Sequence, residues 1–140
     1  MLTRSIKKSE FKQKKLVVDA TDIRMGKLVA MVASILLGKY DAKSVRYVPF
    51  SDHVVIKNIK KMSIHESKGD KLYYRHSMYP GGFRSETLAS LIERNPEKLL
   101  KESIWGMLPK NRYGRMLLGN VDIVDGDIDV TADMELVQVK

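Results

Sequence analysis

The chain has 140 residues, no cysteine and a formal net charge of +8. That length suits one domain with its own hydrophobic core, and the lack of cysteine excludes a disulfide framework and a thiolate metal site. No apolar run approaches the roughly 18 residues of a membrane span, so an integral membrane protein is not expected.

The net positive charge belongs to the first 121 residues. Residues 122–140 contain six carboxylates and one lysine, a net charge of −5, which leaves +13 for residues 1–121. A body this basic attracts polyanions, with an affinity that falls steeply as salt rises. The alternative is a generic solubilising surface, but such surfaces usually mix the two signs more evenly.

The first half of the chain predicts strands and a helix in alternation. Residues 16–18 form a short apolar strand, and residues 28–36 place apolar side chains on one face of a helix that ends at Gly38. Residues 54–56 predict a strand that is apolar enough to be buried on both faces. Residues 59–64 predict a third strand.

Two helices are predicted after residue 84. Ser85 is the expected N-cap of the first helix. Asn95-Pro96 opens the second, with a cap and a proline at the positions where each is favoured. The second helix should bury one apolar face before Pro109 ends it. That face comprises Leu99, Leu100, either Ser103 or Ile104, Met107 and Leu108.

The rest of the chain predicts one more helix and one more strand. Asn111 is expected to cap a short helix that runs through Leu117, and residues 121–124 predict the strand. Apolar side chains recur from Ile123 to Val139, which favours pairing of part of the acidic end as a further strand. The order of elements predicts the α/β class, as a three-layer α/β/α single domain with a small, mostly parallel four-stranded sheet.

Residues 71–84 carry the strongest functional signal. Cationic and aromatic side chains alternate there, and the segment breaks at the turn Pro80-Gly81-Gly82. Cations bind phosphates, aromatic and guanidinium faces stack on unpaired bases, and adjacent glycines let a partner approach the backbone closely. The alternative is an aromatic hairpin packed on its own core. The candidate RNA-binding residues here are Lys71, Tyr74, Arg75, His76, Tyr79, Gly81, Gly82 and Arg84.

A second basic constellation occupies residues 106–115. Pro109 and the predicted cap at Asn111 present the start of a helix, whose free N–H groups favour phosphate. The alternative is a helix–helix corner with ordinary exposed cations. The candidate RNA-binding residues here are Lys110, Asn111, Arg112 and Arg115.

The sequence gives no support to catalytic or metal sites. Gly26-Lys27 lacks the preceding glycine and the following Ser or Thr that a phosphate-binding loop needs. The histidines His53, His65 and His76 are not spaced as a helical pair of zinc ligands. There is no Gly-x-Ser-x-Gly elbow and no thiol nucleophile. We therefore expect no enzyme, no cofactor and no metal.

Together the two constellations resemble the signature of the bacterial-type ribosomal protein thirteen family of the large subunit. The matching blocks are Tyr73 to Ser77 with Tyr79 to Gly82, and Gly106 to Asn111 with Gly114-Arg115. The family's opening strand and helix and its inter-helix turn are matched as well, in the family's order. The resemblance runs from about residue 16 to about residue 118.

The chain departs from the family pattern in three places. It is about three residues shorter between Tyr47-Val48-Pro49 and Asp52. Met78 stands where a glycine is common, and the chain turns acidic after Leu118, where the family continues with basic residues. An acidic end should avoid RNA and face solvent or a basic neighbouring protein.

The resemblance implies a domain that binds 23S-type rRNA and acts early in large-subunit assembly, without enzymatic activity or a cofactor. Carried over residue by residue, it places these on the RNA-facing side: Lys27, Lys39, Tyr74, Arg75, His76, Gly81, Gly82, Lys110 and Arg115.

We expect a basic N-terminal arm over residues 1–15, an RNA-binding α/β domain over 16–121 and an acidic tail over 122–140. The expected partners are 23S-type rRNA and neighbouring large-subunit ribosomal proteins, with no membrane and no small-molecule substrate. The expected state is a monomer within the ribosome, in the cytoplasm or an organelle. The alternatives are a free-standing RNA-binding regulator and a small nucleotide-dependent enzyme.

Overall fold

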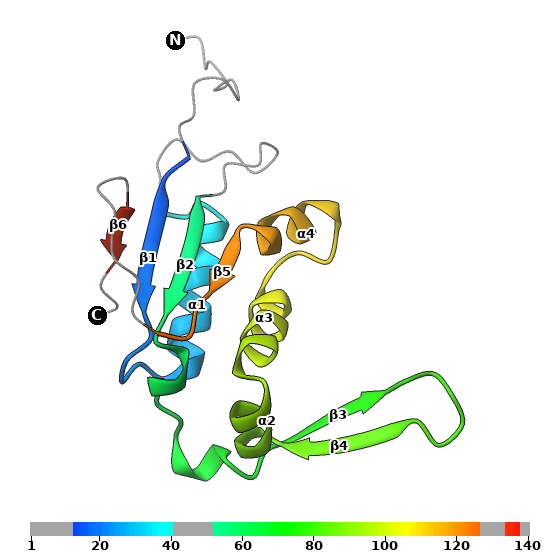
Figure 1. The fold of residues 1–140 in the computed structure, drawn as a ribbon. Coiled ribbons are helices and arrows are strands. Elements are labelled where there is room, and N and C mark those ends of the chain that lie inside the picture. The colour runs from blue at the N-terminus through cyan, green and yellow to red at the C-terminus, as the bar shows by residue number, and fades with distance from the viewer. Residues whose placement is uncertain (1–12, 41–51, 127–133, 138–140) are drawn as a thin grey trace.

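A small parallel sheet forms the centre of the fold (Figure 1). The computed structural model describes residues 13–40, 52–126 and 134–137, and within them the sheet has four strands in the order β5-β2-β1-β6. Every neighbouring pair in it is parallel. The strands are β1 (Lys15–Asp19), β2 (His53–Lys57), β5 (Val121–Ile123) and β6 (Met134–Val137). The predicted α/β fold with a small parallel sheet is confirmed.

The core lies between this sheet and two long helices, α1 (Met25–Leu36) and α3 (Pro96–Met107). One cluster of buried side chains joins Leu16 and Ile56 of the sheet to Leu28 of α1 and Leu100 of α3. Strand residues alternate between faces, and Val17, next to Leu16, is fully buried on the other face. The prediction that α1 buries its apolar face and ends before Gly38, which has a φ of 67°, is confirmed.

The two helices after residue 84 are separated where the sequence predicts, but the first has a different N-cap residue from the predicted one. Helix α2 (Leu88–Arg94) is capped by Thr87, whose Oγ1 accepts a hydrogen bond from the Ser90 N–H at 3.4 Å. The predicted cap, Ser85, was wrong because strand pairing continues through Thr87. Helix α3 begins at Pro96, as predicted, although the Asn95 side chain makes no capping hydrogen bond.

The predicted buried face of α3 is confirmed except at its end. Leu99, Leu100, Ile104 and Leu108 are buried, whereas Met107 is 50% exposed. Helix α4 (Arg112–Gly119) is capped as predicted, because the Asn111 Oδ1 accepts a hydrogen bond from the Gly114 N–H at 2.9 Å. No helix in the described parts of the chain is both long and apolar enough to cross a membrane.

Residues 59–64 do not form the predicted strand. Asn58 takes a left-handed conformation with a φ of 58°, which turns the chain out of β2 and into a 3₁₀ turn at Ile59–Lys61. Ile59 and Met62 still bury their side chains, so the apolar pattern marks core residues without forming a strand. Only Ser63 pairs, in a single bridge to Arg24.

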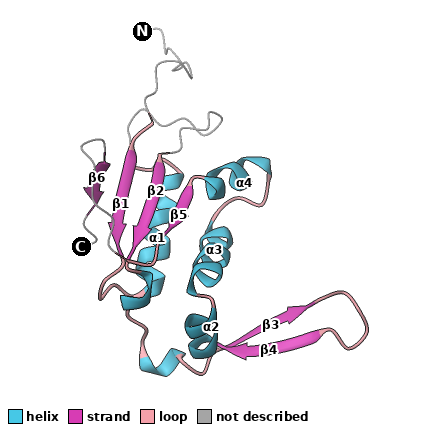
Figure 2. Ribbon diagram, viewed as in Figure 1, coloured by secondary structure: helices cyan, strands magenta, loops and turns pink. Residues whose placement is uncertain are grey.

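Two further strands form a hairpin that projects away from the sheet (Figures 1 and 2). Strand β3 (Leu72–His76) pairs antiparallel with β4 (Phe83–Thr87), and the two make a sheet of their own. A turn at Gly69-Asp70 leads into β3. The base of the hairpin continues directly into α2, which contacts α3.

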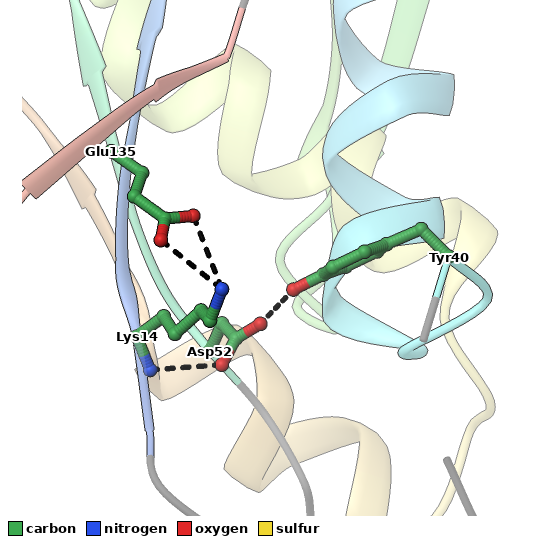
Figure 3. A network of polar contacts seen from close by, with 4 residues as sticks. All are labelled: Lys14, Tyr40, Asp52 and Glu135. Atoms are coloured by element: carbon green, nitrogen blue, oxygen red, sulfur yellow. Dashed lines mark hydrogen bonds and ion pairs between the residues drawn. The ribbon is translucent and has the colours of Figure 1, made fainter. Parts of the chain in front are cut away.

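The acidic end of the chain takes part in the central sheet. Val121–Ile123 and Met134–Val137 form its two outer strands, which confirms the prediction that part of this segment pairs as a strand. Figure 3 shows how β6 is held. The Lys14 ammonium donates to the Glu135 carboxylate at 3.1 and 3.3 Å, and the Lys14 N–H donates to Asp52 Oδ1 at 3.0 Å.

The Tyr40 hydroxyl donates to the other oxygen of Asp52, which ties the segment after α1 to the start of β2 (Figure 3). Burial raises the pKa of the Asp52 carboxyl. The shorter loop before Asp52, most of the basic arm and the remainder of the acidic end lie outside the described residues.

Candidate nucleic-acid interface

The hairpin β3–β4 presents an aromatic pair to solvent. The rings of Tyr74 and Phe83 stack with their centroids 5.7 Å apart and their planes 21° from parallel. Both side chains are more than 60% exposed, at 65% and 62%. The alternative of a hairpin packed on its own core is therefore wrong, and the pair forms an open platform on which a base can stack.

The hairpin tip is a tight turn held by its own backbone. The Ser77 N–H donates to the Gly82 carbonyl at 3.1 Å, and the Gly82 N–H donates to the Tyr79 carbonyl at 2.9 Å. A Cβ on Gly82 would lie 2.1 Å from the Ser77 Oγ and 2.8 Å from the Tyr79 carbonyl oxygen. Gly82 is thus required by the turn itself, whereas at Gly81 the positive φ of 73° is what favours glycine.

Met78 also has a positive φ, of 65°, and its side chain is exposed. This is the position where the family commonly has glycine, and the left-handed backbone explains that preference. The Met78 N–H donates to His76 Nδ1 at 2.9 Å, so His76 supports the turn from within the hairpin. Tyr79 is exposed beside Met78 at the tip.

The arginines of the hairpin lie opposite each other. The strand register pairs Arg75 with Arg84, and two like charges in that position repel. The Arg75 Nη2 is 2.6 Å from the Glu102 Oε1 of α3, and this ion pair offsets part of the repulsion. A second ion pair joins Arg94, at the end of α2, to Glu86 of β4 at 2.6 Å. Both ion pairs are missing from the sequence prediction, because no local pattern links residues that far apart.

Lys71 lies at the base of the hairpin, with its ammonium 5.1 Å from the centroid of the Tyr73 ring. The predicted residues between Lys71 and Arg84 are therefore collected on one projecting element. All of their side chains are exposed, and the Gly82 backbone is half-buried.

The second predicted constellation, residues 106–115, forms the corner between α3 and α4, here called the α4 corner. Some of its predicted RNA-binding residues stabilise the fold instead. The Lys110 ammonium donates to the Trp105 carbonyl at 2.6 Å and lies 4.5 Å from the Trp105 ring centroid, so it closes the end of α3. Asn111 is committed to the cap of α4. A Cβ on Gly114 would lie 1.9 Å from the Pro109 carbonyl oxygen, so only glycine allows this corner to close. Arg112 and Arg115 remain exposed.

The two remaining predicted residues are separated by the length of α1. Lys27 lies in the first turn of this helix, and Lys39 follows its last turn. A helix of this length spans roughly 18 Å. The structure therefore does not bring the predicted residues into one compact site; it arranges them on three elements, namely α1, the hairpin and the α4 corner.

Comparison with known proteins identifies the family of the chain. The family model "Ribosomal protein L13" matches residues 13–129. A large ribosomal subunit protein uL13 from Listeria welshimeri is 44% identical over 121 residues, which cover 86% of this chain and 83% of the relative. The uL13 protein of Kineococcus radiotolerans is 39% identical over 127 residues, covering 90% and 86%. The chain belongs to the ribosomal protein L13 family of the large ribosomal subunit and is not an enzyme.

Proposed function

We propose that this protein binds 23S-type rRNA through the β3–β4 hairpin and the α4 corner and so supports early assembly of the large subunit. The observation that carries the proposal is the exposed stack of Tyr74 and Phe83 on one face of a projecting hairpin whose other face carries Arg75 and Arg84. The aromatic platform takes an unpaired base, and the guanidinium groups on the other face bind phosphates of the surrounding RNA.

The α4 corner supplies a second, electrostatic contact. Arg112 and Arg115 are exposed at the first turn of α4, where the helix dipole also favours an anion. The corner is held rigidly by Asn111 and Gly114, so its cations are presented in a fixed geometry. In the proposed complex the hairpin reads unpaired RNA, while this corner binds the backbone of a neighbouring segment.

Salt dependence of binding tests the proposal. If the protein neutralises about six to ten phosphates, affinity for a 23S-type rRNA transcript should fall by roughly three to five orders of magnitude between 50 and 200 mM salt. Equilibrium filter binding across that range measures the slope. A nearly flat dependence would rule out the basic body as the RNA-binding surface.

Sedimentation then separates a ribosomal role from a free-standing RNA-binding regulator. A constituent of the large subunit sediments with large subunits and their precursors in a sucrose gradient. A regulator that acts alone remains near the top of the gradient even when it binds rRNA fragments in vitro.

A further inference from the structure

A cleft of about 240 Å³ lies between the base of the hairpin and the start of α1, away from the Tyr74–Phe83 platform and from the α4 corner. Its walls are the start of α1, the segment from Ser63 to Lys71, the beginning of β3 and the end of α3. Pockets for drug-sized ligands occupy roughly 300–1,000 Å³, so this cleft suits a smaller group such as a single nucleobase.

The walls of the cleft are tied together by backbone hydrogen bonds. The Met25 N–H donates to the Ser63 carbonyl at 3.2 Å, and the Ser63 N–H donates to the Ile23 carbonyl at 3.0 Å. The Leu88 N–H donates to the Lys71 carbonyl at 2.8 Å, which joins the start of α2 to the same wall. The cleft is therefore formed before any ligand arrives.

The charged side chains that line the cleft are all basic. They are Arg24, Lys68 and Lys71; His65, Ser63 and Ser103 complete the polar lining, and no described lining residue is acidic. This one-sided charge contrasts with the hairpin and α3, where Glu86 and Glu102 neutralise arginines. A site built for an acidic group has this composition, whereas a site for a neutral or basic side chain does not.

The rest of the lining is largely apolar and includes an aromatic ring. Tyr73 and Met107 lie among the lining residues, and Met107 is the apolar side chain of α3 that the core leaves half-exposed. Aromatic rings and thioethers are favourable surfaces for the face of a base. Apolar and cationic groups in one cleft match a base and its phosphate.

We propose that this cleft takes one unpaired nucleotide of the rRNA, with the base against Tyr73 and Met107 and the phosphate between Arg24, Lys68 and Lys71. The inference rests on the proposed rRNA-binding function and adds a pocket to it. The hairpin offers an open platform to a base, whereas the cleft encloses one, so the cleft contributes selectivity for a nucleotide that is free to leave its stack.

Gly26 allows the cleft to be filled without damage to the fold. It lines the cleft, and a Cβ built there meets no other atom within 4 Å. Its backbone is helical, so Gly26→Leu should keep or raise thermal stability because leucine is a better helix former. The control is Ala89→Leu on α2, an exposed helical position that lines neither the cleft nor the proposed interface.

The experiment measures binding of the full chain to a 23S-type rRNA transcript, with ultraviolet cross-linking and mass spectrometry of the same complexes. We expect Gly26→Leu to bind about tenfold to a hundredfold more weakly, the loss typical of one stacked base. We also expect it to lose an RNA cross-link at Tyr73 itself and to keep the cross-link at the neighbouring Tyr74 of the platform. Ala89→Leu should match the wild type in both measurements.

The outcomes separate the two proposals. If the wild type does not bind the transcript, the rRNA-binding function fails, and the cleft proposal fails with it. If the wild type binds and Gly26→Leu binds equally well with the Tyr73 cross-link intact, the cleft proposal alone is overturned. If adenosine monophosphate binds the wild type and not Gly26→Leu, while both bind the transcript equally, the cleft is a site for a free nucleotide and not for rRNA.

Discussion

Arg75 shows how one side chain can face both the fold and a ligand. Its guanidinium pairs with Glu102 on α3, yet both partners are about half-exposed. Surface pairs of this kind contribute at most about 1 kcal/mol to stability. A phosphate can therefore replace Glu102 as the partner of Arg75 at little cost to the fold.

Replacing both hairpin arginines should separate binding from stability. We expect the double variant Arg75→Ala/Arg84→Ala to incorporate poorly into large subunits, because two phosphate contacts are lost. Its melting temperature should stay close to that of the wild type. Quantitative mass spectrometry of purified subunits and a thermal melt of the free protein measure the two effects.

Leu99→Ala is the converse control, since Leu99 is a buried residue of α3 and its truncation should cost about 2–5 kcal/mol. Leu91 of α2 is only half-buried, so Leu91→Ala should cost less. An Arg75→Ala protein that fails to fold would instead make Arg75 a structural residue and contradict its assignment to the RNA site.

Asp19 gives the protein a stability that depends on pH. Its carboxylate accepts hydrogen bonds from the Thr21 hydroxyl at 2.6 Å and the Thr21 N–H at 3.0 Å, and Lys57 lies 3.2 Å away. These contacts hold the pKa of Asp19 well below its ordinary value, even though partial burial acts in the opposite direction.

A lowered pKa in the folded state stabilises the protein above the unfolded-state pKa of about 3.9 and loses that contribution as the pH falls. We therefore expect wild type to exceed Asp19→Asn in unfolding free energy at pH 7. The difference should shrink as the pH falls from about 5 to about 2. Urea unfolding at a series of pH values measures it, and a difference that is constant with pH would contradict the electrostatic explanation.

At the scale of elements, Asn111 is both the N-cap of α4 and a candidate RNA contact. Asn111→Ala removes the capping oxygen and should destabilise the protein by about 0.5–2 kcal/mol. Asn111→Asp keeps a capping oxygen but places a negative charge in the basic corner. We expect Asn111→Asp to fold like the wild type and to bind rRNA more weakly.

Urea unfolding and filter binding of both Asn111 variants make this comparison. If Asn111→Asp binds rRNA as tightly as the wild type, the α4 corner does not approach phosphate. In that case the hairpin would carry the interface without it.

The elements that follow local rules were predictable from the sequence. Helix α1 has its apolar stripe and a terminal glycine, and α4 has its asparagine cap, so each boundary is set by neighbours in the chain. The errors arose where distant contacts decide. The strand register fixes the cap at Thr87, and the left-handed Asn58 turns an apolar segment into a 3₁₀ turn.

The candidate site was predictable in composition and only partly in geometry. The residues of the hairpin lie close together in the chain, so one pattern identifies them all. Glu102 and the cationic cleft depend on how α3 and α1 meet the base of the hairpin, and no spacing in the sequence encodes that. The prediction that Lys110 binds RNA also left out its hydrogen bond to Trp105.

At the scale of the whole molecule, acidic and basic regions meet inside one fold. Glu135 pairs with Lys14, and Asp125 pairs with Lys60, so described carboxylates of the acidic end face basic residues of the body. The acidic end therefore neutralises part of the body as well as extending the sheet.

Removing residues 127–140 should have opposite effects on binding and on folding. The deletion takes away four carboxylates and one lysine, so rRNA affinity should stay equal or rise slightly. It also removes β6 and exposes the edge of β1, so the unfolding free energy should fall.

The control for this deletion is a full-length chain in which Asp127, Asp129 and Asp133 are asparagine, which changes the charge and keeps β6. Filter binding and urea unfolding of both proteins complete the test. A control that loses rRNA binding would place the acidic end in the RNA site.

The attachment of β6 also has a consequence for the order of folding. Lys14 and Glu135 are 121 residues apart, whereas Lys14 and Asp52, at the neighbouring junction of β1 and β2, are only 38 apart. The entropic free-energy cost of closing a loop is about 1 kcal/mol larger for the longer connection. Pairings between residues this distant in the chain form late in folding. The β1-α1-β2 unit can therefore assemble first and serve as the template for β6, which is the last strand to join and the first to detach.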